Sequence, residues 1–210
     1  AYETNSYEFQ PKLILSTPLS ERLVNKLTVG YDEFYAKNRR RSGNLGPTED
    51  LVFIRKATHE VYTLEELTVD EKWLLNTGIR GSWADYSFHQ IEQIAFKSSR
   101  SATLQAYEGG VGYKYNPTSK VYINFSRSYR LPAVDEFFQN LYDFGGGFSG
   151  GGLNTALTAQ KGKEIQFGIK DTTLRNTKLG ISFSLVHNKN EIYYDSSLST
   201  NTNYNGKTRH

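Results

Sequence analysis

Apolar and polar residues alternate along most of the chain with the two-residue period of a β-strand. The clearest example is 121–130, VYINFSRSYR, in which one face carries Val121, Ile123, Phe125 and Tyr129. The opposite face is polar and carries Tyr122, Asn124, Ser126, Ser128 and Arg130. The same alternation marks 26–35, 75–83, 110–115, 164–170 and 179–185. No stretch has the period of an amphipathic helix, so the pattern predicts an all-β protein.

The connections between these strands alternate between short and long. Turn-forming residues cluster at 18–22, 70–72, 116–120 and 176–178, and longer polar or glycine-rich stretches lie near 40–58, 88–101, 131–160 and 195–205. The strands that flank the short turns are about ten residues or longer, above the ~5–6 residues usual in globular sheets. A transmembrane β-barrel combines such strands with short turns on one side and long loops on the other. We therefore expect a segment of an antiparallel transmembrane β-barrel with about eight or nine long strands, in preference to a soluble all-β fold.

The composition excludes several kinds of site and of protein. The 210 residues include no Cys, which excludes a disulfide framework and a thiolate metal site. A net charge of +3 on scattered Lys and Arg residues does not indicate nucleic-acid binding. The basic run at 37–41 has two interpretations, a contact with an anionic ligand or lipopolysaccharide, or a solvated strand end. Apolar runs are far shorter than the roughly 20 residues of a membrane-spanning helix.

Several segments resemble TonB-dependent outer-membrane receptors. The segment VYINFSRSYRLPAVDEFF at 121–138 is similar to a strand and loop of that family. Segments 153–170, 61–83 and 205–210 resemble other parts of the family, in the same order. Two features depart from its pattern: Ala159 stands where the family usually has Pro, and the 131–160 connection is rich in glycine.

The resemblance implies a function and a location. Residues 1–210 are expected to form a single partial β-barrel domain, a central slice of a larger barrel whose plug domain and TonB box lie outside this chain. The implied function is uptake of a scarce nutrient, with a ferric siderophore as the first candidate, in the bacterial outer membrane. The implied partners are that ligand, TonB acting through the plug, and outer-membrane lipid. The alternatives are a passive porin-like channel or, less favoured, a barrel-anchored adhesin or hydrolase.

The sequence offers no catalytic or metal site. The four histidines, His59, His89, His187 and His210, have no metal-binding spacing, and no G-x-S-x-G motif is present. We therefore expect neither an enzyme nor a cofactor. Trp73 and Trp83 suit the aromatic girdles at a membrane interface.

The candidate ligand site lies where the strand at 121–130 enters the long loop. It consists of Arg130, Asp135, Glu136, Phe137, Phe138 and Tyr142. Arg130, the permanent cation on the polar face, either attracts an anionic chelate or pairs with Asp135 or Glu136 to fix the start of the loop. The two acids either bind a cation or cap a turn after Pro132. The aromatic residues, with Phe144 and Phe148, either pack against neighbouring loops or cover the apolar part of a ligand.

Overall fold

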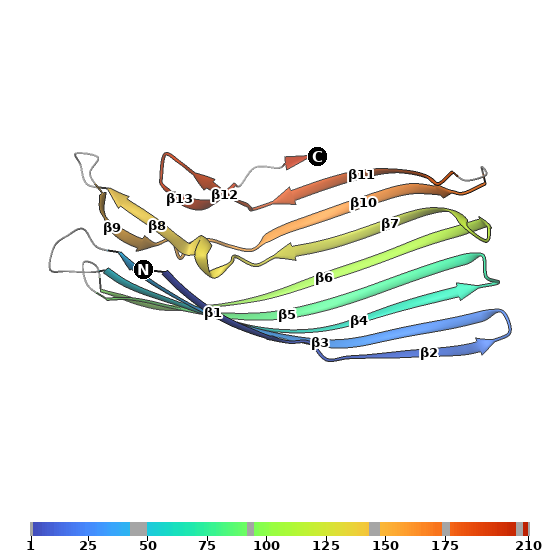
Figure 1. Cartoon of the computed structure of the whole chain (residues 1–210), viewed down its shortest axis with the longest axis horizontal. Helices are drawn as coiled ribbons and strands as arrows, with labels where there is room; N and C mark the ends of the chain where they lie inside the picture. Colours follow the sequence, from blue (N-terminus) through green and yellow to red (C-terminus); the bar gives the residue numbers. More distant parts are fainter. Residues whose placement is uncertain are drawn as a thin grey trace.

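Long β-strands make up most of the computed structural model, which describes residues 2–42, 50–91, 95–142, 148–173, 177–204 and 208–209 (Figure 1). The strands are β1 (Tyr2–Phe9), β2 (Lys12–Ser20), β3 (Leu23–Ser42), β4 (Asp50–Val69), β5 (Trp73–Ile91), β6 (Phe96–Asn116), β7 (Ser119–Arg130), β8 (Phe138–Tyr142), β9 (Phe148–Leu153), β10 (Gln160–Asp171), β11 (Leu179–Lys189), β12 (Glu191–Asp195), β13 (Thr200–Tyr204) and β14 (Thr208–Arg209). A short 3-10 helix, η1 (Val134–Phe137), precedes β8. None of the described helical residues forms a helix long and apolar enough to cross a membrane.

The main sheet is antiparallel, with the order β1-β3-β4-β5-β6-β7-β10-β11-β14 and with β2 also paired to β3. β1 and β2 lie end to end along the same edge of β3 and are separated at Gln10 and Pro11. Proline has no N–H to donate to a ladder and is therefore tolerated in sheets mainly at an edge, which is where Pro11 lies. The Pro11 carbonyl still accepts a hydrogen bond from the Tyr31 N–H at 3.1 Å. The expected antiparallel architecture is confirmed, and the sheet of the described residues is open.

The strands are longer than the sequence pattern indicated. β3 and β4 each contain 20 residues and β6 contains 21. The long connections expected at 40–58 and 88–101 are therefore wrong in extent, because β4 already begins at Asp50 and β5 continues to Ile91. The strands persist here because inward side chains such as Val52, Ile54 and Phe88 are buried beneath other parts of the chain. Likewise, parts of the connections expected at 131–160 and 195–205 form the short strands β8, β9 and β13.

The short and long connections lie at opposite ends of the sheet, as expected. The β2–β3, β4–β5 and β6–β7 turns gather at the right of Figure 1, where β10 ends and β11 begins. Helix η1 and strands β8, β9, β12 and β13 lie towards the other end. The register explains this arrangement, because each pair of neighbouring long strands is antiparallel and joined in sequence.

The two faces of the sheet differ in chemistry. One cross-strand row consists of Leu75, Val111, Ile123, Phe167 and Phe183, and the next row consists of Asn76, Gly110, Asn124, Gln166 and Ser184. On the apolar face Ile123 is 51% exposed and Phe183 is 70% exposed. Further exposed members of this face are Val29, Val61, Ile79, Phe125, Ile165, Ile181 and Leu185. A continuous exposed apolar face of this kind is typical of the lipid-facing side of a barrel wall.

The predicted facing of Tyr129 is wrong. Its hydroxyl donates to Glu60 Oε1 at 3.1 Å, on the polar inner face. β6 pairs with β7 only as far as Tyr107 and Arg127, so the two strands separate just before Tyr129. The Tyr129 side chain can therefore reach the Glu60 carboxylate on the inner face, although strict alternation would place Tyr129 on the outer face.

Aromatic residues mark two levels on the outer face. Trp73 and Trp83 lie on this face of β5, each 47% exposed, and Trp73 packs on Tyr113 with ring centroids 4.8 Å apart. A tilted strand needs about 9–11 residues to cross the hydrocarbon core, which agrees with the spacing of the two tryptophans along β5.

Candidate ligand-binding site

The chain leaves the barrel wall after Arg130 and turns back over the inner face through η1. The Arg130 Nη1 donates to both carboxylate oxygens of Glu136, at 2.8 and 3.0 Å. Glu136 also accepts the Ala133 N–H at 2.8 Å, which secures the first turn of η1. Asp135 is exposed, and no ion pair joins it to Arg130 among the described residues. Of the two interpretations of Arg130, the structure thus contains the pair that fixes the start of the loop.

A second anchor holds the same turn from the barrel wall. Lys56 Nζ on β4 and the Tyr86 hydroxyl on β5 both donate to the Pro132 carbonyl, each at 3.1 Å. Lys56 lies opposite Tyr86, beyond the level of Trp83 and outside the expected membrane span. Burial lowers the pKa of Lys56 to about 8, although Glu60 and Glu136 favour its charged form. Its Nζ also lies 5.7 Å from the ring centroids of Phe34 and Tyr86.

Phe137 and Phe138 are packed rather than open to solvent. Phe137 is 1% exposed, with its ring centroid 5.2 Å from that of Tyr86 and 4.9 Å from that of Phe88. Phe138 is 7% exposed, and the Arg40 guanidinium lies 5.3 Å from its ring centroid. In this conformation neither ring offers a surface to a ligand, and both stabilise the docked loop. Tyr142 ends β8 and Phe148 begins β9, but their side chains and all of Phe144 lie outside what the structure describes.

Two connections that are distant in sequence form one unit here. Strands β12, β13, β8 and β9 make a second sheet, in which Thr200 of β13 pairs with Gln139 of β8. The Asn203 Nδ2 donates to the Thr158 and Asn190 carbonyls at 3.0 and 2.8 Å. Further side-chain bonds run from Asn154 Nδ2 to the Asn201 carbonyl at 2.7 Å and from Asn201 Nδ2 to the Glu136 carbonyl at 3.0 Å. We call η1, β8, β9, β12 and β13 together the loop cap.

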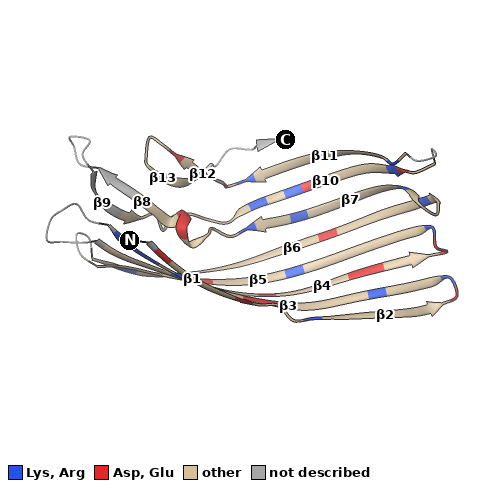
Figure 2. Ribbon diagram, in the orientation of Figure 1, with Lys and Arg blue, Asp and Glu red and all other residues tan. Residues whose placement is uncertain are grey.

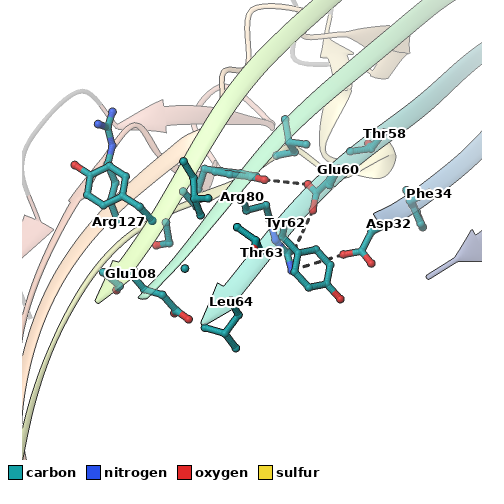
Figure 3. A pocket seen from close by; sticks show the side chains of 18 of the residues that line it. Asp32, Phe34, Thr58, Glu60, Tyr62, Thr63, Leu64, Arg80, Glu108 and Arg127 are labelled. Atoms are coloured by element: carbon teal, nitrogen blue, oxygen red, sulfur yellow. Dashed lines mark hydrogen bonds and ion pairs between the residues drawn. The ribbon is translucent and has the colours of Figure 1, made fainter. Parts of the chain in front are cut away.

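A cleft of about 680 Å³ opens on the inner wall beside the loop cap (Figure 3). At its centre Arg80 lies between two acids, with Nη1 2.9 Å from Glu60 Oε2 and Nη2 3.6 Å from Asp32 Oδ2. The Arg80 guanidinium also lies 4.8 Å from the ring centroid of Tyr62. Asp32 and Glu60 are directly opposite in the register, a repulsive arrangement that the shared Arg80 offsets.

The lining of the cleft is acidic overall. Its acids are Glu8, Asp32, Glu60 and Glu108, and its cations are Lys56, Arg80 and Arg127. It can therefore accept hydrogen bonds from hydroxyl or amine groups more readily than it can hold a bare anion. No group of three or more His, Cys, Asp or Glu residues arranged to hold a metal occurs within the described ranges. The sequence analysis missed this cluster because each strand contributes one or two residues, which only the register brings together.

The histidines lie elsewhere. His59 is on the outer face, where its Nδ1 lies 2.8 Å from the Tyr31 hydroxyl. His89 packs against Phe53 on the same face, with ring centroids 6.1 Å apart, and His210 falls outside the described residues. None of the described histidines lines the cleft.

The architecture is that of a β-barrel membrane protein, since an antiparallel wall of long strands carries a folded cap on its inner side. Over residues 2–210 the sequence matches the family described as TonB dependent receptor-like, beta-barrel. No curated protein matches the chain. The chain belongs to the TonB-dependent receptor β-barrel family.

Solved structures share the fold. A double mutant of the Serratia marcescens hemophore receptor HasR, in complex with its hemophore HasA and heme, is similar with a TM-score of 0.77 and 13% identity, over 99% of this chain and 38% of that chain. The ferric-catecholate import receptor Fiu from E. coli K12, in its closed form, gives a TM-score of 0.70 at 17% identity, over 99% and 34% of the two chains. The siderophore receptor PiuA from Acinetobacter baumannii gives 0.68 at 17% identity, over 99% and 35%. The chain thus spans little more than a third of the length of these proteins, and at such identities the likeness shows the fold alone.

Proposed function

We propose that this chain is part of the barrel of an outer-membrane receptor that imports a scarce nutrient, with residues 1–210 forming one portion of a single barrel domain. The observation that carries the proposal is the combination of a family match along the chain with a wall that is apolar outside and polar inside. The family match supports placement of this barrel in the bacterial outer membrane. Energy for import would come from TonB acting through a plug domain.

For the ligand we propose a ferric siderophore. Fiu and PiuA are described as receptors for ferric catecholates and siderophores, whereas HasR is described with heme, so a heme-type ligand is the main competitor. Hydroxyl or amine groups of such a chelator that do not bind the iron suit the acidic cleft, whose carboxylates accept hydrogen bonds.

The loop cap gives the candidate site a mechanical role in this proposal. Arg130, Glu136, Lys56 and Tyr86 hold the start of the cap against the wall, and Phe137 fills the space beneath it. A ligand arriving from outside would meet Arg130 and Asp135 at the exposed edge before it reached the cleft. Contacts with Phe137 or Phe138 would require the cap to lift, because both rings are buried.

An uptake experiment with the full-length receptor tests this function. A strain lacking the gene, with and without a plasmid copy, is supplied with radiolabelled ferric catecholate or with heme as the iron source. We expect accumulation of the ferric chelate that requires both the receptor and TonB. Uptake that persists without TonB would support a passive channel instead, and heme uptake alone would overturn the siderophore assignment.

A further inference from the structure

A second pocket, of about 270 Å³, lies on the inner face of the wall, between the cleft and the short turns. Strands β5, β6, β7 and β10 line it. Its polar lining side chains are Asn76, Lys120, Tyr122, Asn124, Gln166 and Lys170. No acid lines it among the residues that the structure describes, whereas the cleft has four. We call it the turn-side pocket.

Three lysines form a cross-strand row at the turn end of this pocket. Lys120 of β7 is directly opposite Lys170 of β10 on one side and directly opposite Lys114 of β6 on the other. Like charges in directly opposed positions destabilise a sheet. Within the described part of the chain, none of the three side chains forms a hydrogen bond or an ion pair, and only Lys120 lies near a ring, with its Nζ 5.7 Å from the centroid of Tyr122. We call Lys114, Lys120 and Lys170 the lysine row.

The floor of the turn-side pocket is built over two glycines. The Tyr122 ring lies over Gly168, where a Cβ would lie 2.5 Å from the ring. A Cβ at Gly110 would overlap the side-chain amides of Asn76 and Asn124, so both amides reach over that glycine. Each amide carries two N–H donors. Together with the ammonium groups of the lysine row, these donors can hold a group that only accepts hydrogen bonds, such as a carboxylate.

The charge of the inner face changes along the wall. Glu108 on β6 and Glu164 on β10 are six residues from Lys114 and Lys170 on the same strands, a separation of about 20 Å. Figure 2 shows blue segments at the turn ends of β6, β7 and β10 and red segments further along β3 and β6. The potential therefore becomes more positive towards the turns, which attracts an anion in that direction.

We propose that the turn-side pocket and the lysine row form a transient site that holds an anionic ferric chelate while it leaves the barrel at the turn end. The inference rests on the proposed transport function, and it adds that the imported chelate carries a net negative charge. One anionic arm of the chelate would enter the pocket, and its oxygens would lie between the opposed lysines and relieve their repulsion. Lysine suits a site that is entered and left, because it offers a point charge on a flexible stem instead of a rigid guanidinium fork.

The test separates import from binding in cells that express the full-length receptor. The row variant Lys120→Gln/Lys170→Gln removes two charges of the lysine row, and the control Lys97→Gln/Lys163→Gln removes two exposed lysine charges from the outer face. The probe is a radiolabelled ferric tris-catecholate, which is an anion. We expect its TonB-dependent uptake to fall about tenfold or more in the row variant and to stay within about twofold of wild type in the control. Lys120→Arg/Lys170→Arg, which keeps both charges, should import like wild type.

Binding of the same probe to cells that lack TonB shows at which stage the lysine row acts. The Kd should be the same for the wild type, the row variant and the control, because the row is placed after the first binding step. A Kd that weakens in the row variant as much as uptake falls would overturn the proposal, because the lysines would then act in first binding or in assembly.

Thermal unfolding of the purified receptor without ligand tests the other occupant, an acidic side chain from a part of the receptor outside residues 1–210. Because opposed like charges are destabilising, the row variant should unfold at the same temperature as the control or at a higher one. A lower unfolding temperature would mean that the receptor itself neutralises the row, and would overturn the proposal. Uptake that is unchanged in the row variant, or lost equally in the control, would overturn it as well. Absence of uptake by the wild type would instead contradict the proposed transport function, and this inference with it.

Discussion

Removing the Arg130 guanidinium should loosen the loop cap. Arg130→Ala deletes the contacts with both Glu136 oxygens and the weaker one from Nε to Gln160 Oε1 at 3.4 Å. The Arg130 side chain is 45% exposed and that of Glu136 is 21% exposed, so solvent weakens the pair. We therefore assign it about 1 kcal/mol, the upper end for exposed pairs, which corresponds to about a fivefold increase in local opening.

Hydrogen exchange of peptides covering 131–142, in the full-length receptor, measures that opening. Glu136→Gln should reproduce the effect and add the weakening of its bond to the Ala133 N–H, whereas Asp135→Asn should leave exchange unchanged. Arg22→Ala is the matched control, because it removes another exposed ion pair, with Asp70, at the opposite end of the sheet. Unchanged exchange in Arg130→Ala would refute the anchoring role. A tenfold loss of ligand affinity with unchanged exchange would instead assign Arg130 to ligand binding.

Three further predictions follow from other parts of the structure. The pKa of Lys56 in the folded protein, about 8, is below its ordinary value of 10.5, so the unfolded state binds more protons than the folded state between these two pH values. The free energy of unfolding should therefore rise from about pH 8 to about pH 10.5, and this gain should be lost as the pH falls back through 8. Thermal unfolding of the receptor across this pH range checks the prediction, and Lys56→Met should remove the pH dependence. Gly168→Val should destabilise the barrel by about 1–3 kcal/mol, because a Cβ there would lie 2.5 Å from the Tyr122 ring, whereas Gly180→Val, with open space around it, should cost far less in urea unfolding. Ile123→Arg, which places a cation on the lipid face near the membrane midplane, should lower the free energy of unfolding by roughly 2–4 kcal/mol. An unchanged free energy of unfolding in the same assay would contradict the outward facing of Ile123.

The barrel wall was predictable from sequence because each strand carries its own evidence. In 121–130 the alternation fixes both the strand and the two faces, and only Tyr129, beyond the last β6–β7 pair, escapes it. The lengths of β3 to β6 were not predictable, since their cap-side halves are stabilised by burial under a loop whose position the sequence does not specify. For the same reason the rings of Phe137 and Phe138 had two interpretations until their neighbours Tyr86, Phe88 and Arg40 were known.

The cleft is the clearest example of a site whose residues come together only in the folded sheet. Asp32, Glu60 and Arg80 lie on three different strands, and each in isolation is an ordinary polar residue on an inner face. The register places the two acids opposite each other and Arg80 within reach of both. A sequence method would need the pairing of β3 with β4 and of β4 with β5 before it could recognise the cluster.

The central claim is that this wall crosses the outer membrane with its loop cap outside and its short turns inside. Residues 1–210 contain no Cys, so single cysteines can report on it in a full-length receptor from which any other Cys has been removed. One cysteine replaces Leu198, which is 61% exposed between β12 and β13, and one replaces Thr118 in the β6–β7 turn. Intact cells expressing the full-length receptor are treated with a maleimide reagent too large to pass through porins. The account predicts labelling of Leu198→Cys on intact cells, and labelling of Thr118→Cys only after the outer membrane is permeabilised. Labelling of both positions on intact cells, or of Thr118→Cys alone, would contradict it.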